Sequence, residues 1–180
     1  MNFERQPFHL AQNALETLDT VGQWFGMLSL RLLLAWEFGE AGFEKLHGSN
    51  WFADIQDQFP WPFKLIPADL NWAMATGFEI MGAFALVIGL GTRLFSASLI
   101  VLTVVAIVSV HWPQAWSTWA ELFEGYALTD KGQGNFKLPL IYIAMLVPLV
   151  FMGPGRLSLD YFFQNRIGRI ISILQITSRK

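Results

Sequence analysis

The feature that most constrains the fold is the placement of a few charges in a very apolar chain. Residues 94–110 and 138–155 contain no Asp, Glu, Lys or Arg, whereas two further apolar stretches, about 22–46 and 69–92, contain some. Runs of about 17–25 apolar residues are long enough to cross a bilayer as helices. The runs are continuous rather than alternating, which favours helices over a membrane barrel. We therefore predict an all-α fold, an integral membrane four-helix bundle.

The bundle is predicted to form a single membrane domain over residues 1–180. The predicted spans cover about residues 22–46, 69–91, 94–112 and 136–153. Amphipathic patterns predict two flanking interfacial helices, at about 8–20 and 159–176. For the first of these, packing against the end of the bundle is the alternative. Pro148 is predicted to kink the last span, and the loops at 47–68 and 113–135 are rich in aromatic residues.

Composition excludes several classes of function. The chain has no cysteine, so it forms no disulfide, thiolate metal site or iron–sulfur cluster of its own. Redox chemistry would therefore need a bound cofactor or a partner protein. The net charge of −2 gives no electrostatic reason to bind nucleic acid.

Basic residues predict the orientation of the spans, because Lys and Arg accumulate on the cytoplasmic side. One side of the four-span arrangement carries Arg5, Arg93, Arg156, Arg166, Arg169, Arg179 and Lys180. The other side carries Lys45, Lys64, Lys131 and Lys137. We predict a multi-pass protein of the bacterial inner membrane with both termini in the cytoplasm and the aromatic loops outside.

The charges inside the first span are candidates for function, because a charge at that depth costs about 2.5–3.5 kcal/mol and is usually paired or functional. Four polar residues recur at helical spacing and share one face, with the basic residues of the span on roughly the opposite side. The four are Glu37, Glu40, Glu44 and His47. Cationic partners at similar depth are Lys45, His111 and Lys137. Glu79 lies near the middle of the second span, and Arg31 is its predicted cationic partner. The alternative to a functional role is that the two form a purely structural ion pair that holds the spans in register.

Two ligand alternatives follow from the histidines. Glu40, Glu44 and His47 have a spacing compatible with a metal site, and His47 and His111 end neighbouring spans where axial haem ligands would meet. Neither pattern is specific, because carboxylates spaced by four are common on helices and no haem attachment motif is present. We predict no metal site.

Three sets of motifs follow one another along the chain. The first span carries Arg31-Leu32-Leu33-Leu34-Ala35-Trp36 and Gly42-x-x-Lys45-Leu46, and the second carries Glu79 before Gly89-Leu90-Gly91-Thr92-Arg93. The closing motif is Gly153-Pro154-Gly155-Arg156-Leu157-Ser158-Leu159-Asp160. With these motifs, the chain resembles the DoxX family of small four-span membrane proteins. The resemblance implies proximity to quinone, since the founding member is similar to a subunit of a thiosulfate:quinone oxidoreductase. Other relatives resemble accessory proteins of redox complexes.

We therefore predict a quinone-interacting subunit of a membrane oxidoreductase, with quinone as the cofactor. Glu37, Glu40 and Glu79 are the predicted proton-handling, catalytic residues. The predicted cofactor-binding residues are Arg31, Trp36, His47, Trp72, His111 and Trp112. The histidines would donate to a ring oxygen, the tryptophans would stack on the ring, and Arg31 would fix Glu79.

Two other functions remain open. The chain is alternatively a non-catalytic scaffold in the lipid bilayer, with its outer aromatic loops docking a protein partner or a second copy of itself. A third alternative is a small proton-coupled transporter.

Overall fold

The computed structural model describes residues 6–128 and 134–166, and within these ranges the chain is helical and contains no strand. The all-α prediction is thus confirmed. The main helices are α1 (Gln6–His47), α2 (Ala68–Ile88), α3 (Thr92–Ala106), α4 (Trp119–Glu124) and α5 (Lys137–Met152). Shorter turns are η1 (Phe52–Gln58), η2 (Phe63–Leu65) and η3 (Ile107–His111), a π-helical turn that continues α3. Residues 159–166 are also helical.

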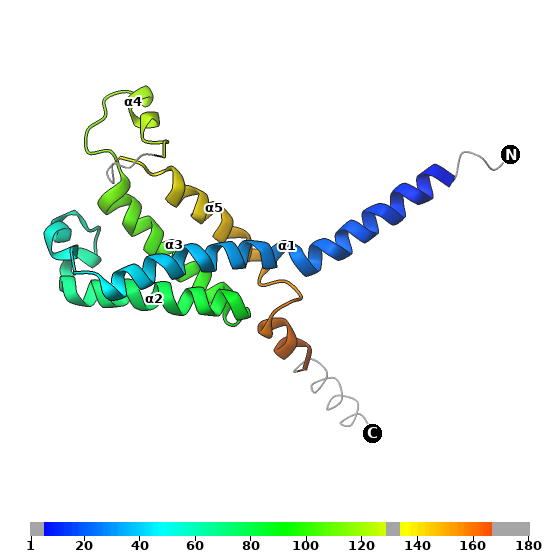
Figure 1. Cartoon of the computed structure of the whole chain (residues 1–180). Helices are drawn as coiled ribbons and strands as arrows, with labels where there is room; N and C mark the ends of the chain where they lie inside the picture. Colours follow the sequence, from blue (N-terminus) through cyan, green and yellow to red (C-terminus); the bar gives the residue numbers. More distant parts are fainter. Residues whose placement is uncertain (1–5, 129–133, 167–180) are drawn as a thin grey trace, which may run out of the picture.

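The long helices form two antiparallel pairs, α1 with α2 and α3 with α5 (Figure 1). The pairs meet at one end, where α2 turns into α3, and diverge toward the other end, which carries η1, η2 and α4. We call these the turn end and the loop end. Buried apolar side chains join the pairs in one core. It includes Leu34, Phe38, Leu86, Leu99, Leu146 and Leu149.

Helices α1 and α2 approach closely because small residues lie between them. A Cβ atom on Gly42 would stand 3.0 Å from the Glu79 Cβ and 3.1 Å from the Ile80 backbone nitrogen. These are contacts that real side chains rarely make. At Gly39, by contrast, an added Cβ would meet the Ala83 Cβ at an ordinary 3.5 Å. Gly42 therefore sets the distance at which α1 can reach Glu79.

Helix α1 corrects the prediction of a separate interfacial helix at 8–20. It runs unbroken through that segment for 42 residues, about 63 Å at 1.5 Å per residue. Nothing in residues 20–22 interrupts the helix, because no Pro occurs there and a single Gly only weakens it. The part before about residue 24 extends beyond the bundle at the turn end (Figure 1). The second predicted interfacial helix begins as expected at residue 159, but its part after residue 166 lies outside the described residues.

Arg31 fastens the turn end. Its side chain is 1% exposed and donates four hydrogen bonds to backbone carbonyl oxygens. Two go to the last turn of α2, from Nε to Leu86 at 2.7 Å and from Nη2 to Val87 at 2.8 Å. Two go from Nη1 to the segment after α5, to Pro154 at 3.0 Å and Leu157 at 2.7 Å. Carbonyls at a helix end lack donors from their own helix. The guanidinium, with five N–H donors, supplies hydrogen bonds to carbonyls of two chain segments at once.

Asp160 completes this junction from the other side. Its carboxylate accepts from the Gly91 N–H at 2.8 Å and the Thr92 N–H at 2.9 Å, which are the first donors of α3. Its own N–H donates to the Gly89 carbonyl at 2.9 Å. A carboxylate at a helix N-terminus pairs with free N–H groups and with the positive end of the helix dipole. The turn between α2 and α3 is therefore at Gly89–Gly91, and Thr92 and Arg93 belong to the first turn of α3.

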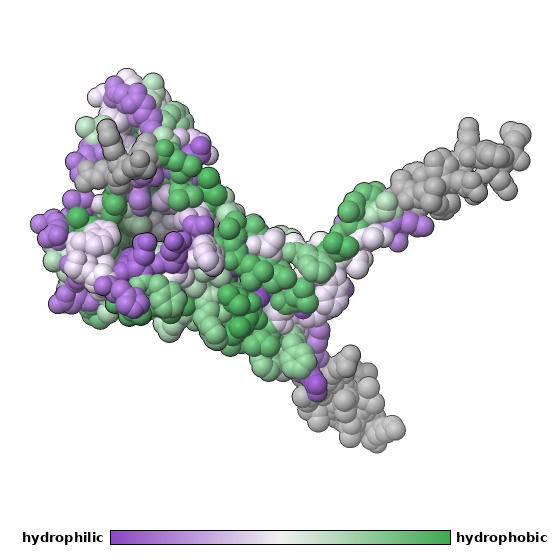
Figure 2. Space-filling model, in the orientation of Figure 1, coloured by the Kyte–Doolittle hydropathy of each residue, from purple (hydrophilic) through white to green (hydrophobic). Residues whose placement is uncertain are grey.

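Two helices in the described part of the chain have the length and apolar composition of a membrane span, Ala68–Ile88 and Thr92–His111. Lys137–Met152 is apolar but shorter, and α1 carries several charges. The outward surface of the bundle is apolar, with exposed side chains such as Phe84, Leu94 and Phe151. Figure 2 shows this apolar surface along the middle of the molecule, with hydrophilic residues gathered at the loop end. These features suggest a membrane protein.

The short helix α4 lies in the loop predicted for 113–135 and has its own start signal. Thr118 caps it by accepting from the Glu121 N–H at 3.3 Å, and the Ser117 N–H donates to Glu121 Oε2 at 2.6 Å. This is a capping-box arrangement. The hydrogen bond from Ser117 lowers the pKa of the Glu121 carboxyl, because it favours the charged form.

Candidate functional site

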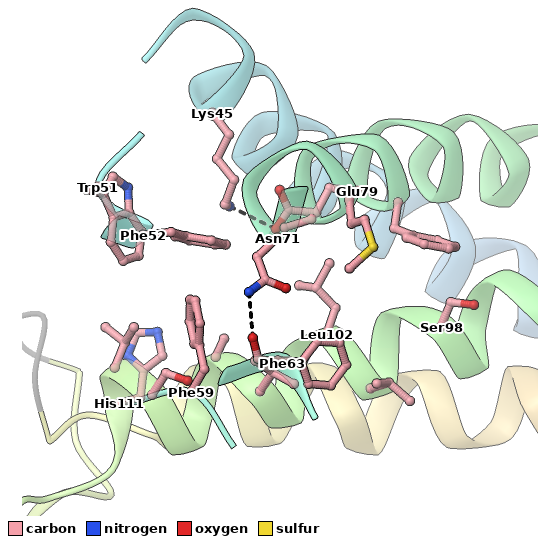
Figure 3. Close-up of a pocket in the computed structure, with 18 residues that line it drawn as sticks. Lys45, Trp51, Phe52, Phe59, Phe63, Asn71, Glu79, Ser98, Leu102 and His111 are labelled. Carbon is pink, nitrogen blue, oxygen red and sulfur yellow. Dashed lines mark hydrogen bonds and ion pairs between the residues drawn. The ribbon is translucent and has the colours of Figure 1, made fainter. Parts of the chain in front are cut away.

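A cavity of about 470 Å³ opens at the loop end, between α2, α3 with its π-helical end, and the segment that carries η1 and η2 (Figure 3). Apolar and aromatic side chains make most of its wall: Trp51, Phe52, Phe59, Phe63, Met74, Ala75, Phe78, Val101, Leu102, Val105, Ala106 and Val110. The polar lining consists of Lys45, Asn71, Glu79, Ser98, Ser109 and His111. A largely apolar cavity with a few converging polar groups is typical of a small-molecule site.

Amide side chains hold the loop over this cavity. Asn71, in the first turns of α2, donates from Nδ2 to the carbonyls of Phe63 at 2.8 Å and Ile66 at 3.2 Å. Gln56 in η1 donates to the carbonyls of Ile66 at 2.6 Å and Lys64 at 3.0 Å. These side-chain donors supplement the few backbone hydrogen bonds of the loop, such as the one from the Ile66 N–H to the Phe63 carbonyl at 3.1 Å. The η1–η2 segment is thus fixed as one wall of the site.

The aromatic part of this wall is a cluster of edge-on rings. Phe52 contacts Trp51, Phe59 and Trp72 with ring centroids 4.9, 5.1 and 5.0 Å apart. Trp51 also meets Trp72 edge-on at 6.0 Å. Edge-to-face packing is the favourable geometry for aromatic pairs. Trp72 therefore supports the wall from behind, and the rings of Trp51, Phe52 and Phe59 face the cavity (Figure 3).

An ion pair crosses the wall from α1 to α2. Lys45 Nζ lies 2.9 Å from Glu79 Oε1, and the two side chains are 17% and 4% exposed. This corrects the predicted pair of Arg31 and Glu79, since the donors of Arg31 go to backbone carbonyls at the turn end. Lys45 reaches Glu79 because Gly42, one turn earlier, lets α1 come close to α2 at this level. A carboxylate in such apolar surroundings needs a cation beside it to stay charged.

Several polar atoms of the cavity wall have no hydrogen-bond partner among the described residues. They are Glu79 Oε2, Asn71 Oδ1 and Ser109 Oγ. These three residues are 3, 5 and 4% exposed, so bulk water does not reach them. Unpaired buried polar atoms are costly and call for a ligand or a water molecule. The cavity therefore has chemical as well as steric capacity for a bound molecule.

The π-helical turn shapes the far side of the cavity. It carries Ser109 and His111, which both line the space, and it ends where Trp112 takes the extended conformation that a following Pro requires. Single π-turns are frequent at functional sites. His111 Nδ1 lies 2.7 Å from Asn135 Oδ1, which orients the ring.

Apolar side chains also border the mouth of the cavity. Phe78 on α2 and Val101 on α3 line it and are 40% and 51% exposed on the outer surface of the bundle. The entrance between α2 and α3 is therefore lined by apolar rather than charged side chains. A lipid-soluble molecule would enter from this side.

Most of the other predicted site residues lie elsewhere. Glu37 accepts a hydrogen bond from the Tyr142 hydroxyl of α5, Glu40 is exposed on the same face of α1, and Trp36 is 71% exposed. Arg31 is at the turn end. The structure thus brings Glu79 and His111 into the cavity and leaves the acidic face of α1 outside it.

The remaining candidates also lie away from the cavity. His47 is exposed and bonds the Phe43 carbonyl at 2.9 Å, so it does not share a site with His111. Trp112 stacks on Phe136 with centroids 5.4 Å apart. In residues 6–128 and 134–166, no three side chains of His, Asp or Glu are grouped to hold a metal ion, so the alternative on Glu40, Glu44 and His47 gains no support.

Asn71 and Ser109 were missed by sequence reasoning. Both are uncharged polar residues inside apolar stretches, and such residues usually bond their own helix backbone. A polar residue at the start of a span, next to a loop that needs donors, is the one signal that pointed to Asn71.

Comparisons with known proteins find the same family that the sequence motifs indicate. The DoxX family model matches residues 26–112. An uncharacterized protein of Haemophilus influenzae is 46% identical over 143 residues, which cover 79% of this chain and 86% of that protein. No solved structure matches the chain. The relative is similar over most of both chains. The region that the family model matches includes Arg31, Gly42, Lys45 and Glu79. The chain therefore belongs to the DoxX family of small membrane proteins.

Proposed function

We propose that this protein is a quinone-binding subunit of a bacterial membrane oxidoreductase and that the cavity at the loop end holds the quinone ring. The observation that carries the proposal is the buried Lys45–Glu79 ion pair in the wall of an otherwise aromatic cavity. A volume of about 470 Å³ is within the range of about 300–1,000 Å³ that small-molecule sites occupy. The apolar mouth between α2 and α3 suits a ligand dissolved in the bilayer.

The side chains of the cavity divide the work of such a site. The rings of Trp51, Phe52 and Phe59 exclude water and offer faces and edges to a flat ring. Lys45 has two further N–H donors for a ring oxygen. Glu79 is the proton-handling group, since it lines the cavity and its Oε2 has no partner among the described residues. The bound quinone supplies the electron-accepting chemistry.

The wider setting is part of the same proposal. We place four helices across the membrane: the part of α1 alongside α2, then α2, α3 with η3, and α5. Their apolar outer surface and the 21 residues of α2, about 31 Å, match a hydrocarbon core of about 30 Å. Arg93 lies in the first turn of α3, and Arg156 and Arg166 lie in the segment after α5, so all three are on the side of the turn end. Because basic residues accumulate on the cytoplasmic side, this end and both termini would face the cytoplasm at the inner membrane. Electrons would arrive from a donor or partner protein at the loop end.

Glu37 and Glu40 keep only a peripheral place in this proposal. They lie on the face of α1 turned toward α5 and outside the cavity lining. Their part in proton transfer stays a prediction.

Filling the cavity tests the proposal. Ala75→Phe adds a ring to the wall, and we expect it to weaken binding of decylubiquinone at least about tenfold, because the added atoms occupy the ligand's space. Quenching of tryptophan fluorescence measures the affinity of the purified protein in nanodiscs. Ala97→Phe is the matched control, since Ala97 is exposed on α3 and outside the cavity. Equal affinity in Ala75→Phe and the native protein would rule out this site.

A second candidate is favoured by the aromatic tips of the loop end. Trp61, Trp119 and Phe123 are 81, 70 and 65% exposed there. Aromatic side chains of this kind are common anchors of protein interfaces. The protein would then be a scaffold that docks a partner protein. Purification in mild detergent separates the two: a stoichiometric partner without quinone favours the scaffold.

A further inference from the structure

The free polar atoms of the cavity are predominantly hydrogen-bond acceptors. Glu79 Oε2 and Asn71 Oδ1 are both unpaired among the described residues, and the two residues are only 3% and 5% exposed. A carboxylate has only acceptors to offer. The Lys45 ammonium already occupies the other carboxylate oxygen. The second carboxylate oxygen, Oε2, can therefore accept a hydrogen bond from a bound ligand.

The orientation of Asn71 is determined by its neighbours. Its Nδ2 group donates to two loop carbonyls, at Phe63 and Ile66. Turning the amide over would place Oδ1 against these two carbonyl oxygens, so the side chain cannot exchange its donor for its acceptor without losing both bonds. Figure 3 shows the amide with its nitrogen toward the Phe63 carbonyl. Oδ1 is thus held as a second open acceptor.

His111 supplies a third acceptor in its neutral state. Its Nδ1 faces the amide oxygen of Asn135 at 2.7 Å, so the ring hydrogen is on Nδ1. In a neutral imidazole the other nitrogen, Nε2, is then an acceptor. Ser109, also in this wall, has a hydroxyl that serves either a donor or an acceptor.

We propose that the cavity binds an aromatic ring bearing two hydroxyl groups, the hydroquinone, in preference to the corresponding quinone. This inference rests on the proposed function. A quinone offers two carbonyl oxygens, which can take the spare donors of Lys45 but leave the buried acceptors of Glu79 and Asn71 unpaired. A hydroquinone offers two O–H donors, which pair such acceptors. A buried acceptor that loses its water and gains no hydrogen bond raises the free energy of the complex. The hydroquinone avoids this cost and the quinone does not, so the hydroquinone is bound more tightly.

The preference has a consequence for electron flow. A site that binds the reduced form tenfold more tightly raises the two-electron midpoint potential of the bound pair by about 30 mV. The bound quinone is then a better acceptor than quinone free in the membrane. Such a site favours the arrival of electrons from a donor, which is the direction of the proposed function.

An anaerobic titration tests the preference. The native protein in nanodiscs is titrated with decylubiquinone and, separately, with decylubiquinol, and tryptophan quenching gives both dissociation constants. We expect the hydroquinone to bind at least about tenfold more tightly, the effect of one charge-assisted hydrogen bond. Glu79→Gln replaces an acceptor by an amide that also donates, and should reduce the preference to threefold or less, or reverse it. Glu44→Gln, an exposed position on α1, should keep it.

The outcomes separate the two proposals. If both forms bind equally, or the quinone binds more tightly, the inference is overturned while the quinone site stands. If neither form binds, the proposed function fails with it. Should Glu79→Gln fold poorly because Lys45 loses its partner, the double variant Lys45→Gln/Glu79→Gln keeps an uncharged hydrogen-bonded pair. The native comparison decides the inference in any case.

Discussion

Replacing Arg31 with methionine is expected to destabilise the protein by at least about 3 kcal/mol. The guanidinium is 1% exposed and donates to four carbonyls, in the last turn of α2 and in the segment after α5. Methionine has a similar length but no donor, so four carbonyl acceptors, one in a buried and three in part-buried hydrogen bonds, lose their partner at once. For a chain of this size the midpoint of thermal unfolding should fall by at least about 6 °C. Thermal unfolding in detergent, followed by circular dichroism, measures it.

Two further variants show that the effect belongs to this geometry. Arg31→Lys keeps the positive charge, but an ammonium cannot reproduce the fork that reaches both chain segments, so we expect it to recover less than half of the loss. Arg166→Met removes an exposed arginine that lies over the Phe162 ring, and should change the midpoint by no more than about 2 °C. An Arg31→Met protein as stable as the native one would contradict this account of the turn end.

Removing Lys45 alone is expected to cost about as much as removing Arg31, whereas removing Lys45 together with Glu79 should cost little. Lys45→Met leaves a carboxylate that is 4% exposed without its cation, and stranding a buried charge costs about 3–5 kcal/mol. In Lys45→Met/Glu79→Met both charges are gone and the apolar volume is kept. Replacing a whole buried pair in this way is often neutral. Denaturant or thermal unfolding of the single and double variants measures the coupling.

An exposed ion pair, between Lys64 and Asp57, is the matched control for this cycle. Lys64 lies 3.3 Å from Asp57, with side chains 51% and 96% exposed. Lys64→Met should therefore change the free energy of unfolding by less than about 1 kcal/mol. If the double variant at 45 and 79 loses as much stability as the two single variants together, Lys45 and Glu79 do not act as a pair.

Much of the helical framework is predictable from the sequence. The charge-free run at 94–110 falls within α3 and η3. Gly89 and Gly153 end α2 and α5, and Gly91 precedes α3, all three with positive φ. Glycine tolerates such φ values because it lacks a Cβ, so its position punctuates the chain reliably. The length of α1 was not predictable in the same way. An amphipathic segment and a span that follow each other in phase leave no local sign of whether the helix breaks between them.

The partners of charged residues are the part that sequence reasoning could not supply. Helical spacing correctly separates the acidic face of α1 from Lys45 and Arg31, but it does not say which neighbouring helix meets each face. The predicted depth of Arg31 assumed that the span begins near residue 22. In the structure α2 ends level with Arg31, so this residue lies at the turn end and meets carbonyls rather than Glu79.

The candidate site shows the same division. Glu79, His111 and the aromatic loop are recognisable in the sequence, because charges and clustered aromatic residues stand out in an apolar chain. The roles of Asn71 and Ser109 depend on long-range contacts, a loop folded back onto α2 and a π-helical turn at the end of α3. A polar residue at the start of the span is the one local sign of the first feature, and the second has none that sequence analysis can detect.

The central claim is that a quinone ring occupies the cavity beside the Lys45–Glu79 pair. Photolabelling of the native protein in nanodiscs with an azidoquinone, followed by mass spectrometry of the labelled peptides, tests it most directly. We expect label to concentrate in residues 51–63, 71–79 and 98–111, which line the cavity, and excess decylubiquinone to suppress it. Label confined to the acidic face of α1 near Glu37 and Glu40, or spread evenly over the outer surface without competition, would contradict it.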